Sequence, residues 1–293
     1  MRRWSVSVAA LAAVTFVAAV SVWAQGGTVF ELHKVAEAHF QPSTDHPVFI
    51  LVVGTDFRPG VDGHRADSIH VIGVNPVAGA ATILGIPRDT FVNIPGRGRG
   101  KINDAFRFGG PALQAAVVAQ LTGIPLGYVI STDFAGFQAM VNELGGVDVN
   151  VPFPMRERLS GANFPQGRVH MDGAAALAFA RNRHIPDGDV RRSLHQGDLI
   201  VAALAKLRVE QAGATGALRS LVVLGRHAGI HGVGLGELYR LGRLGLSIDP
   251  ARVRNVVMPS SVGSAGAASV VFPAGGAAGL FADMRDDAVL QAH

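Results

Sequence analysis

Short apolar runs of strand length alternate with helical segments along the chain, and this alternation limits the possible folds most strongly. Val48–Gly54 is apolar almost throughout, which is typical of a strand buried on both faces. Further strands are expected at Ser68–Val74, Ala81–Ile86, Tyr128–Ser131 and Val147–Val151, with helices at 111–121 and 134–144. Strands that alternate with helices in this way predict an α/β sandwich.

The rest of the chain continues the pattern without a recognisable linker or internal repeat. Helices are expected at 173–180, from Asp189 to 209, and at 216–227, 236–244 and 277–289, and strands at 253–258 and 270–272. Residues 155–172 are interpreted as a polar excursion, and 27–46 as a polar connector with a short helix over Glu31–His39. We therefore expect one domain over residues 47–293, with a motif core at 47–208 and a C-terminal extension at 209–293.

The first 26 residues are expected to form a membrane anchor or a signal sequence. Arg2 and Arg3 precede an uncharged run from Trp4 to Ala24, and about twenty apolar residues suffice to cross a bilayer. The basic pair predicts a cytoplasmic N-terminus, so a single-pass protein would carry its domain on the extracytoplasmic side of the cell membrane. Cleavage after Ala24, where small residues fit a signal-peptidase site, would release a secreted protein instead.

The composition excludes several classes of function. The chain has no cysteine, which excludes a disulfide framework, a thiol nucleophile and a cysteine-based zinc site. A formal net charge of +4 favours anionic partners, but two Trp and two Tyr offer few stacking surfaces for nucleic acid, which is not expected as a partner. The sequence also lacks the Gly-x-x-x-x-Gly-Lys-Ser/Thr, Gly-x-Ser-x-Gly and His-Glu-x-x-His patterns of nucleotide P-loops, lipase-like hydrolases and zinc proteases.

The segment from Arg181 to Gln196 has an unusual density of polar side chains. It holds four arginines, two aspartates, two histidines and a glutamine in sixteen positions. Asp189 is placed to cap a new helix, on which Arg192 and Gln196 share one face and Arg191 and His195 the neighbouring one. Forked donors at a helix N-terminus are suited to phosphate oxygens. A solvated, salt-bridged helix face is the alternative interpretation.

Two aspartates lie in loops that flank the expected strands. Asp56 follows the first strand and Asp67 precedes the second, and two carboxylates with open neighbouring positions are a usual way to hold Mg²⁺ on a phosphate. Arg58, Arg65 and Arg88 lie beside them in the sequence. A turn or cap role for the aspartates, with simple ion pairs to the arginines, is the alternative.

Taken together, these motifs form an ordered series that resembles one family. The series comprises Thr55–Arg58, Arg65–Ser68, Ile86–Thr90, Lys101–Asn103, Asp133–Phe137, Leu144–Val149, Ala178–Arg183 and Asp187–Asp189, followed by Arg192 and Gln196. In order and spacing it is similar to the LytR–CpsA–Psr family over about residues 47–208, and residues 250–289 resemble the tail of actinobacterial members.

The resemblance implies a fold, an activity and partners. Such proteins are membrane-anchored phosphotransferases with an α/β/α sandwich fold and a hydrophobic groove for a polyprenyl chain. They move glycopolymers from a polyprenyl-pyrophosphate carrier to peptidoglycan through a phosphodiester, with Mg²⁺, or alternatively Mn²⁺, at the pyrophosphate. Phosphoryl transfer depends on positioning and charge neutralisation more than on covalent catalysis, which agrees with a site made of arginines and aspartates.

The resemblance also implies roles for individual residues. Asp56 and Asp67 would hold the metal and, with Arg65, Arg88 and Asp89, would form the catalytic group. The expected pyrophosphate-binding and supporting residues are Arg58, Arg65, Arg88, Lys101, Asn103, Arg181, Arg183, Asp189, Arg192, His195 and Gln196. Asp89 and Asp189 are candidates for the general base.

His195 departs from the family pattern, which often has arginine immediately before the glutamine. Arg191 would compensate for the lost charge, and His195→Arg is expected to keep or raise activity. Two further hypotheses stay open: a hydrolase that uses the same site with water as the acceptor, and a non-catalytic protein that binds the lipid pyrophosphate, in which His195 would mark lost catalysis.

Overall fold

A computed structural model of the chain describes residues 30–35, 46–56, 64–183, 188–210 and 228–291. Within these ranges, seven strands form one mixed sheet: β1 Phe30–Lys34, β2 Val48–Thr55, β3 Ala66–Asn75, β4 Ala80–Gly85, β7 Tyr128–Thr132, β12 Ala228–His231 and β13 Val253–Val257. Their order is β12-β1-β7-β2-β3-β4-β13. Residues beyond 208 thus supply both edge strands of the described sheet, β12 and β13.

The central strands are buried on both faces. All six residues of β4 are buried, and β2 has at most intermediate exposure along its whole length. On one face, Leu51 and Val53 join a large core cluster. On the other, Ile50 joins a second cluster beside Tyr128. A sheet covered on both sides needs apolar residues at successive positions, which explains the continuous apolar run at the start of the domain.

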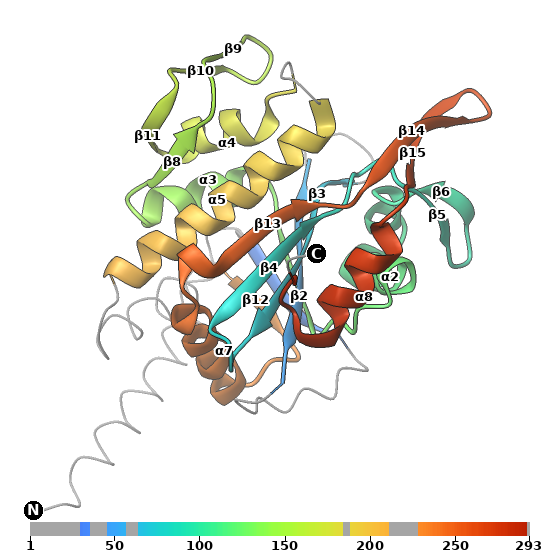
Figure 1. Cartoon of the computed structure of the whole chain (residues 1–293), viewed down its shortest axis with the longest axis horizontal. Coiled ribbons are helices and arrows are strands. Elements are labelled where there is room, and N and C mark those ends of the chain that lie inside the picture. Colours follow the sequence, from blue (N-terminus) through green and yellow to red (C-terminus); the bar gives the residue numbers. More distant parts are fainter. Residues whose placement is uncertain (1–29, 36–45, 57–63, 184–187, 211–227, 292–293) are drawn as a thin grey trace, which may run out of the picture.

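Helices cover both faces of this sheet (Figure 1). On one face lie α2 Asp104–Thr122 and α8 Ala277–Asp287, which share a core with β2 and β3. On the other lie α3 Phe134–Glu143, α5 Gly188–Glu210 and α7 Leu235–Ser247, while α4 Gly173–Arg181 packs against α3 and α5. The predicted α/β sandwich is confirmed for the described part of the chain, with the helix–sheet–helix layers that the resemblance implies.

Among the described residues, four two-stranded sheets, three of which are hairpins, and one short helical turn lie outside these layers. The paired strands are β5 Phe91–Ile94 with β6 Gly98–Lys101, β8 Val147–Val151 with β11 Gly167–Met171, β9 Met155–Glu157 with β10 Ala162–Phe164, and β14 Ser260–Ala265 with β15 Ala268–Pro273. A 3₁₀ turn, η1 Pro250–Arg252, leads into β13.

Most of the predicted elements are observed within a few residues of their expected bounds. The Asp133 carboxylate caps α3 as predicted, accepting a hydrogen bond of 2.7 Å from the Gly136 amide. Asp189 is different: α5 begins at Gly188, so Asp189 lies in the first turn rather than at the cap. Pro111 begins the second part of α2, after non-helical backbone at Gly109 and Gly110.

Two predicted segments have a different structure. The short helix expected over Glu31–His39 is wrong for its described residues, because Phe30–Lys34 form β1, in which Phe30 and Leu32 point into the core with the period of two of a strand. The sheet therefore begins within the segment interpreted as a connector. The polar excursion at 155–172 contains the strands β9, β10 and β11.

The expected membrane segment at residues 1–26 and the helix at 216–227 lie outside the described residues. Among the helices that the structure does describe, none is both long enough and apolar enough to cross a membrane.

Two glycines test how tightly the helical layer is packed. A methyl group on Gly173 would lie 2.2 Å from the backbone oxygen of Gln138, so Gly173→Ala must push α4 away from α3. We expect a loss of about 1–3 kcal/mol in the free energy of unfolding, measured by denaturant titration. Gly279 in α8 has open space around it. Gly279→Ala should instead stabilise the protein by up to about 1 kcal/mol. Equal effects of the two substitutions would contradict this packing.

Candidate active site

The ends of three strands bring the first set of charged residues to one edge of the sheet. β2 and β3 are antiparallel, and Thr55 at the end of β2 lies opposite Ala66 at the start of β3. β4 runs antiparallel to β3, so the loop that follows Gly85 emerges at the same edge. Asp56, Asp67 and Arg88 therefore gather there, which confirms the expectation that these loops share one edge of the sheet.

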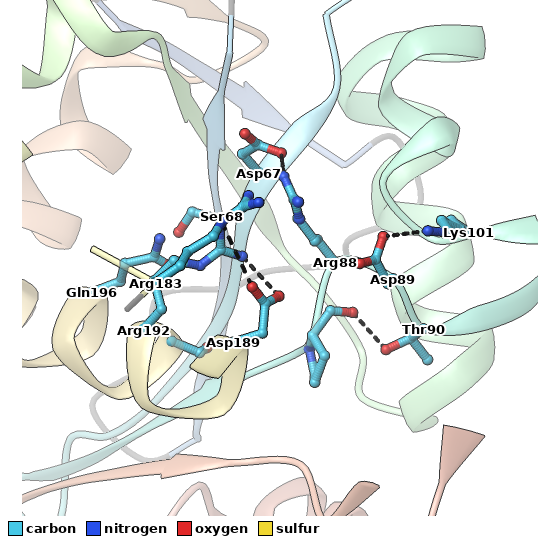
Figure 2. Close-up of polar contacts among 12 residues, drawn as sticks. Asp67, Ser68, Arg88, Asp89, Thr90, Lys101, Arg183, Asp189, Arg192 and Gln196 are labelled. Carbon is cyan, nitrogen blue, oxygen red and sulfur yellow. Dashed lines mark hydrogen bonds and ion pairs between the residues drawn. The ribbon is translucent and has the colours of Figure 1, made fainter. Parts of the chain in front are cut away.

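An ion pair joins two of these residues across neighbouring strands. The Arg88 guanidinium donates to the Asp67 carboxylate, and Figure 2 shows the contact. Burial alone would lower the pKa of Arg88, but the adjacent Asp67 carboxylate, together with Asp189 and Asp89, raises it overall. Asp56 accepts a hydrogen bond of 3.1 Å from the Arg65 amide through one of its oxygens. Arg88 thus stays charged in a half-buried position.

The start of α5 contributes the opposite wall of charged groups. Asp189 in its first turn accepts a hydrogen bond of 2.9 Å from Arg192 and lies 3.9 Å from the Arg183 guanidinium (Figure 2). Burial lowers the pKa of Arg192 to about 10, although Asp189 opposes this shift. Arg192 therefore remains cationic at neutral pH with a side chain only 6% exposed. One turn along, the Gln196 amide donates to the Ala180 carbonyl at 3.1 Å, which ties α5 to the end of α4.

One end of a cavity of about 1250 Å³ is lined by Asp56, Asp67, Arg88, Arg183, Arg192 and Gln196. Arg181 also lines it, and its guanidinium lies 4.9 Å from the centre of the Phe134 ring, a cation–π arrangement. The cavity is therefore bounded at this end by four arginines, from the loop after β4, from α4, from α5 and from the segment between the two helices. Such forked donors favour the oxygens of a phosphate group.

The body of the same cavity is apolar. It runs between the sheet and the helices α3 and α5, and Val52, Ile72 and Ile130 form its floor on the sheet side. The larger apolar lining residues from the rest of the chain are Phe30, Phe134, Phe137, Met140, Val141, Leu144, Leu159, Leu177, Leu199, Ile200, Leu204 and Leu207. Ala180, Ala203 and the acidic residues Asp133, Glu143 and Glu157 also lie at its wall. A long apolar cavity that opens at a charged end is suited to an amphipathic lipid whose head group carries negative charge.

The structure brings seven of the predicted site residues to this cavity: Asp56, Asp67, Arg88, Arg181, Arg183, Arg192 and Gln196. Other predicted residues do not line the cavity. Arg65 pairs with Asp104 at 2.9 Å, and Asp89 pairs with Lys101 at 3.0 Å. The backbone of Asn103 bonds to both Arg88 and Ala66. Asp189 acts through Arg192 and Arg183, and Arg58 lies outside the described residues.

His195 does not face this cavity, so its position gives no support to the predicted role in pyrophosphate binding. It shares a face of α5 with Arg191, as the helical spacing predicts, and both line a second cavity of about 530 Å³ on the other side of the helix. Its ring stacks on Phe179 at 4.5 Å, and within the described chain neither ring nitrogen has a hydrogen-bond partner. Burial lowers the pKa of His195 to about 4, so the ring is neutral at pH 7.

A second buried histidine, His70, joins the two walls of the site. Its Nε2 lies 3.0 Å from the Ser193 carbonyl on α5, and its Nδ1 lies 3.1 Å from the hydroxyl of Ser68, which lines the cavity. A neutral ring fits both contacts, with Nε2–H donating and Nδ1 accepting. Burial lowers the pKa of His70 to about 4. The sequence did not predict this role of His70, because its partner Ser193 on α5 is 123 positions away and no local pattern in β3 indicates that contact.

A sequence profile of the LytR_cpsA_psr family matches residues 24–260, which is most of the chain. The chain belongs to this family. It is 39% identical over 166 residues to the polyisoprenyl-teichoic acid–peptidoglycan teichoic acid transferase TagU of Bacillus mycoides, which covers 56% of this chain and 54% of that protein. It is 31% identical over 251 residues to the probable cell wall biosynthesis protein LcpB of Corynebacterium glutamicum, with 80% and 60% covered.

The fold agrees with solved structures of the LytR_cpsA_psr family. The LytR-CPS2A-psr family protein YwtF (TagT) with bound octaprenyl pyrophosphate lipid superimposes with a TM-score of 0.63 and 22% identity, over 85% of this chain and 93% of that one. This likeness confirms the mixed α/β fold of a single domain. The chain spans little more than half the length of the two curated relatives it matches.

The two buried histidines predict how stability depends on pH. Both have a folded-state pKa near 4 against an ordinary value of 6.5, so the unfolded state takes up their protons first as the pH falls. The free energy of unfolding should fall from pH 6.5 to 4, by up to about 3 kcal/mol for each histidine. His195→Leu should flatten this slope and, since it removes two buried nitrogens, cost no stability at pH 7. Denaturant titrations at several pH values would measure both effects, and an unchanged slope would contradict the buried, neutral state of His195.

Proposed function

We propose that this protein transfers a glycopolymer from a polyprenyl-pyrophosphate carrier to peptidoglycan and forms a phosphodiester link. The observation that carries the proposal is the continuity of one cavity, with four arginines and two aspartates at one end and apolar side chains along its body. A polyprenyl pyrophosphate matches this arrangement, with an anionic pyrophosphate for the charged end and an apolar chain for the body of the cavity. The names of the relatives, a teichoic acid transferase and a protein with bound octaprenyl pyrophosphate, support the same assignment.

The arginines would perform most of the catalytic work. Arg88, Arg183 and Arg192 are held by carboxylates at fixed positions, so they need little rearrangement as charge develops on the pyrophosphate. The acceptor hydroxyl of a peptidoglycan sugar attacks the phosphorus that bears the glycopolymer. A new P–O bond forms to the acceptor, the P–O bond to the bridging oxygen breaks, and polyprenyl phosphate leaves. The guanidiniums stabilise negative charge on both the transferred and the departing phosphate.

Magnesium is part of this proposal, with Asp56 and Asp67 as its protein ligands. Mg²⁺ on a phosphate substrate commonly uses only one or two carboxylates and keeps several waters. Among the described contacts, each of these aspartates uses one oxygen, Asp56 for the Arg65 amide and Asp67 for Arg88, so the second oxygen of each suits a cation. When bound, the ion would neutralise charge on the pyrophosphate. Mn²⁺ would use the same ligands.

The proton of the acceptor hydroxyl needs a base within the cavity. Neither Asp89 nor Asp189 lines the cavity. The Asp89 carboxylate pairs with Lys101, and the Asp189 carboxylate pairs with Arg192 and Arg183. Their positions therefore favour a supporting role over the general-base role considered from the sequence.

The proposal also includes a location. The uncharged run from Trp4 to Ala24 behind Arg2 and Arg3 would anchor the protein with its domain on the extracytoplasmic side of the cell membrane. There the carrier lipid and peptidoglycan are both within reach.

Product analysis tests the proposed reaction. The full-length protein would be incubated with a polyprenyl-pyrophosphate-linked saccharide and peptidoglycan fragments, with Mg²⁺ or with a chelator, and followed by mass spectrometry. We expect a saccharide–peptidoglycan phosphodiester adduct and polyprenyl phosphate, both only with Mg²⁺. Released lipid phosphate with water as the acceptor would support a hydrolase, and tight lipid binding without turnover would support a binding protein. Either result would overturn the transferase assignment.

Two neighbouring arginines on α5 provide a matched pair for the charged end. Arg192 lines the cavity, whereas Arg191 faces the second cavity on the other side of the helix. Arg192→Ala should lower turnover by about 10²- to 10³-fold, as the loss of a fixed donor to a developing anion does. Arg191→Ala should leave turnover near the wild-type rate. Rates would be compared after thermal unfolding has shown that both variants fold, and equal losses would contradict the assignment of the two faces.

Two neighbouring alanines provide a matched pair for the apolar body. Ala203 lines the main cavity and Ala202 lines the second one, and both are half-buried. Ala203→Trp should obstruct the cavity and raise the KM for long polyprenyl carriers more than for a ten-carbon geranyl carrier. Ala202→Trp should not change the preference for chain length. If the two variants accept long and short carriers in the same ratio, the lipid does not occupy this cavity.

A further inference from the structure

Three potential metal ligands meet at the β12 edge of the sheet. Glu31 and His33 lie on β1, and His231 lies on β12, directly opposite His33 in the parallel pair. His33 Nε2 lies 3.0 Å from the Glu31 carboxylate, and the two imidazole rings stack at 4.3 Å with an angle of 8°. A ligand atom from each of the three side chains lies within 4.8 Å of the other two.

This cluster faces away from the proposed lipid cavity. Phe30 and Leu32 point to the face that carries α7, and Phe30 lines the cavity. Because side chains alternate along a strand, Glu31 and His33 point to the opposite face. They share that face with Val129 of β7, which packs in the core beneath α2. The cluster is therefore separate from Asp56 and Asp67.

We propose that Glu31, His33 and His231 form a binding site for a transition-metal ion, with Zn²⁺ as the best match. Two imidazoles and a carboxylate form a common protein ligand set for Zn²⁺, and water would complete a tetrahedron. Residues at i and i+2 of one strand, with a third directly opposite on the next, place three side chains over one spot of the sheet. His231 is exposed, so its ring can turn from the stacked position toward a shared ion.

The position of the ion indicates a structural role. Of the described strands, β12 is an edge strand that pairs only with β1, through four residues nearly 200 positions away in the chain. An ion between His33 and His231 would join these distant strands at their common register. It would also fix the strand that presents Phe30 to the cavity. Metal binding is thus expected to raise stability, since binding to the folded state alone stabilises it.

A histidine–carboxylate pair in a different sheet offers a control of the same chemistry. His170 on β11 lies 3.0 Å from Asp148 on β8, also across paired strands. No third histidine or carboxylate forms a three-ligand group with this pair within the part of the chain that the structure describes. A histidine therefore lies beside a carboxylate at both sites, but only the Glu31–His33 pair has a third potential ligand, His231, among the described residues.

Metal binding to the full-length protein tests the inference without reference to activity. The protein would be stripped with chelator and titrated with Zn²⁺ by calorimetry, and with Co²⁺ by visible absorption, while thermal unfolding is followed with and without metal. We expect stoichiometric Zn²⁺ binding, a tetrahedral Co²⁺ spectrum and a higher Tm that chelator reverses. His33→Ala and His231→Gln should each weaken binding by more than the roughly 10- to 100-fold that loss of an outer partner costs.

The controls separate this site from others. His170→Ala, and a double variant with Asp56→Asn and Asp67→Asn, should keep the Zn²⁺ affinity and the Co²⁺ spectrum of the wild type. His231→Gln changes an exposed residue at the sheet edge, so it reports on the site even if His33→Ala does not fold. The inference is overturned if the wild type shows no stoichiometric binding, if His231→Gln binds as tightly as the wild type, or if the aspartate variant abolishes binding.

Discussion

The candidate site depends on keeping several guanidiniums charged and close together beside an apolar cavity. Like charges repel strongly where water is scarce, and burial disfavours each of them. The structure meets this cost with two carboxylates: Asp67 holds Arg88, and Asp189 holds Arg192 and approaches Arg183. Asp67 comes from the sheet and Asp189 from α5, so the two walls are neutralised separately and can face one anion between them.

Helix α5 connects this electrostatic arrangement to the rest of the fold. One face carries Arg192, Gln196 and Ala203 along the main cavity, and the neighbouring face carries Arg191 and His195 toward the second. The helix is positioned over the sheet by the neutral ring of His70, which joins β3 to the Ser193 carbonyl, and by close packing at Gly85 of β4, where an added methyl group would lie 2.2 Å from the Ser193 hydroxyl. The charged end and the apolar body are therefore set by one element.

Much of this was predictable from local patterns. The apolar runs fixed β2, β3 and β4, and their antiparallel order brought Asp56, Asp67 and Arg88 to one edge. Helical spacing correctly separated Arg192 from His195, but periodicity does not say which face meets the cavity, and the family pattern favoured a role for both. Likewise, Leu238 of α7 packs in a core and Leu204 of α5 lines the cavity, yet both are leucines on amphipathic helices and the sequence does not separate the two roles. The β1–β12 pairing is a contact between distant segments, and no local signal in Phe30–Lys34 indicated it.

The central claim is that one lipid occupies the whole cavity, with its pyrophosphate at the arginines and its chain along α5. Photo-crosslinking with a polyprenyl pyrophosphate that carries a photoreactive group at the far end of its chain tests this directly. Peptide mapping should place the crosslinks on apolar cavity residues of α3 and α5, such as Met140 and Leu207, and excess unlabelled lipid should suppress them. Crosslinks at Ala202 or Ala205 of the second cavity, or a uniform distribution over the surface, would contradict the account.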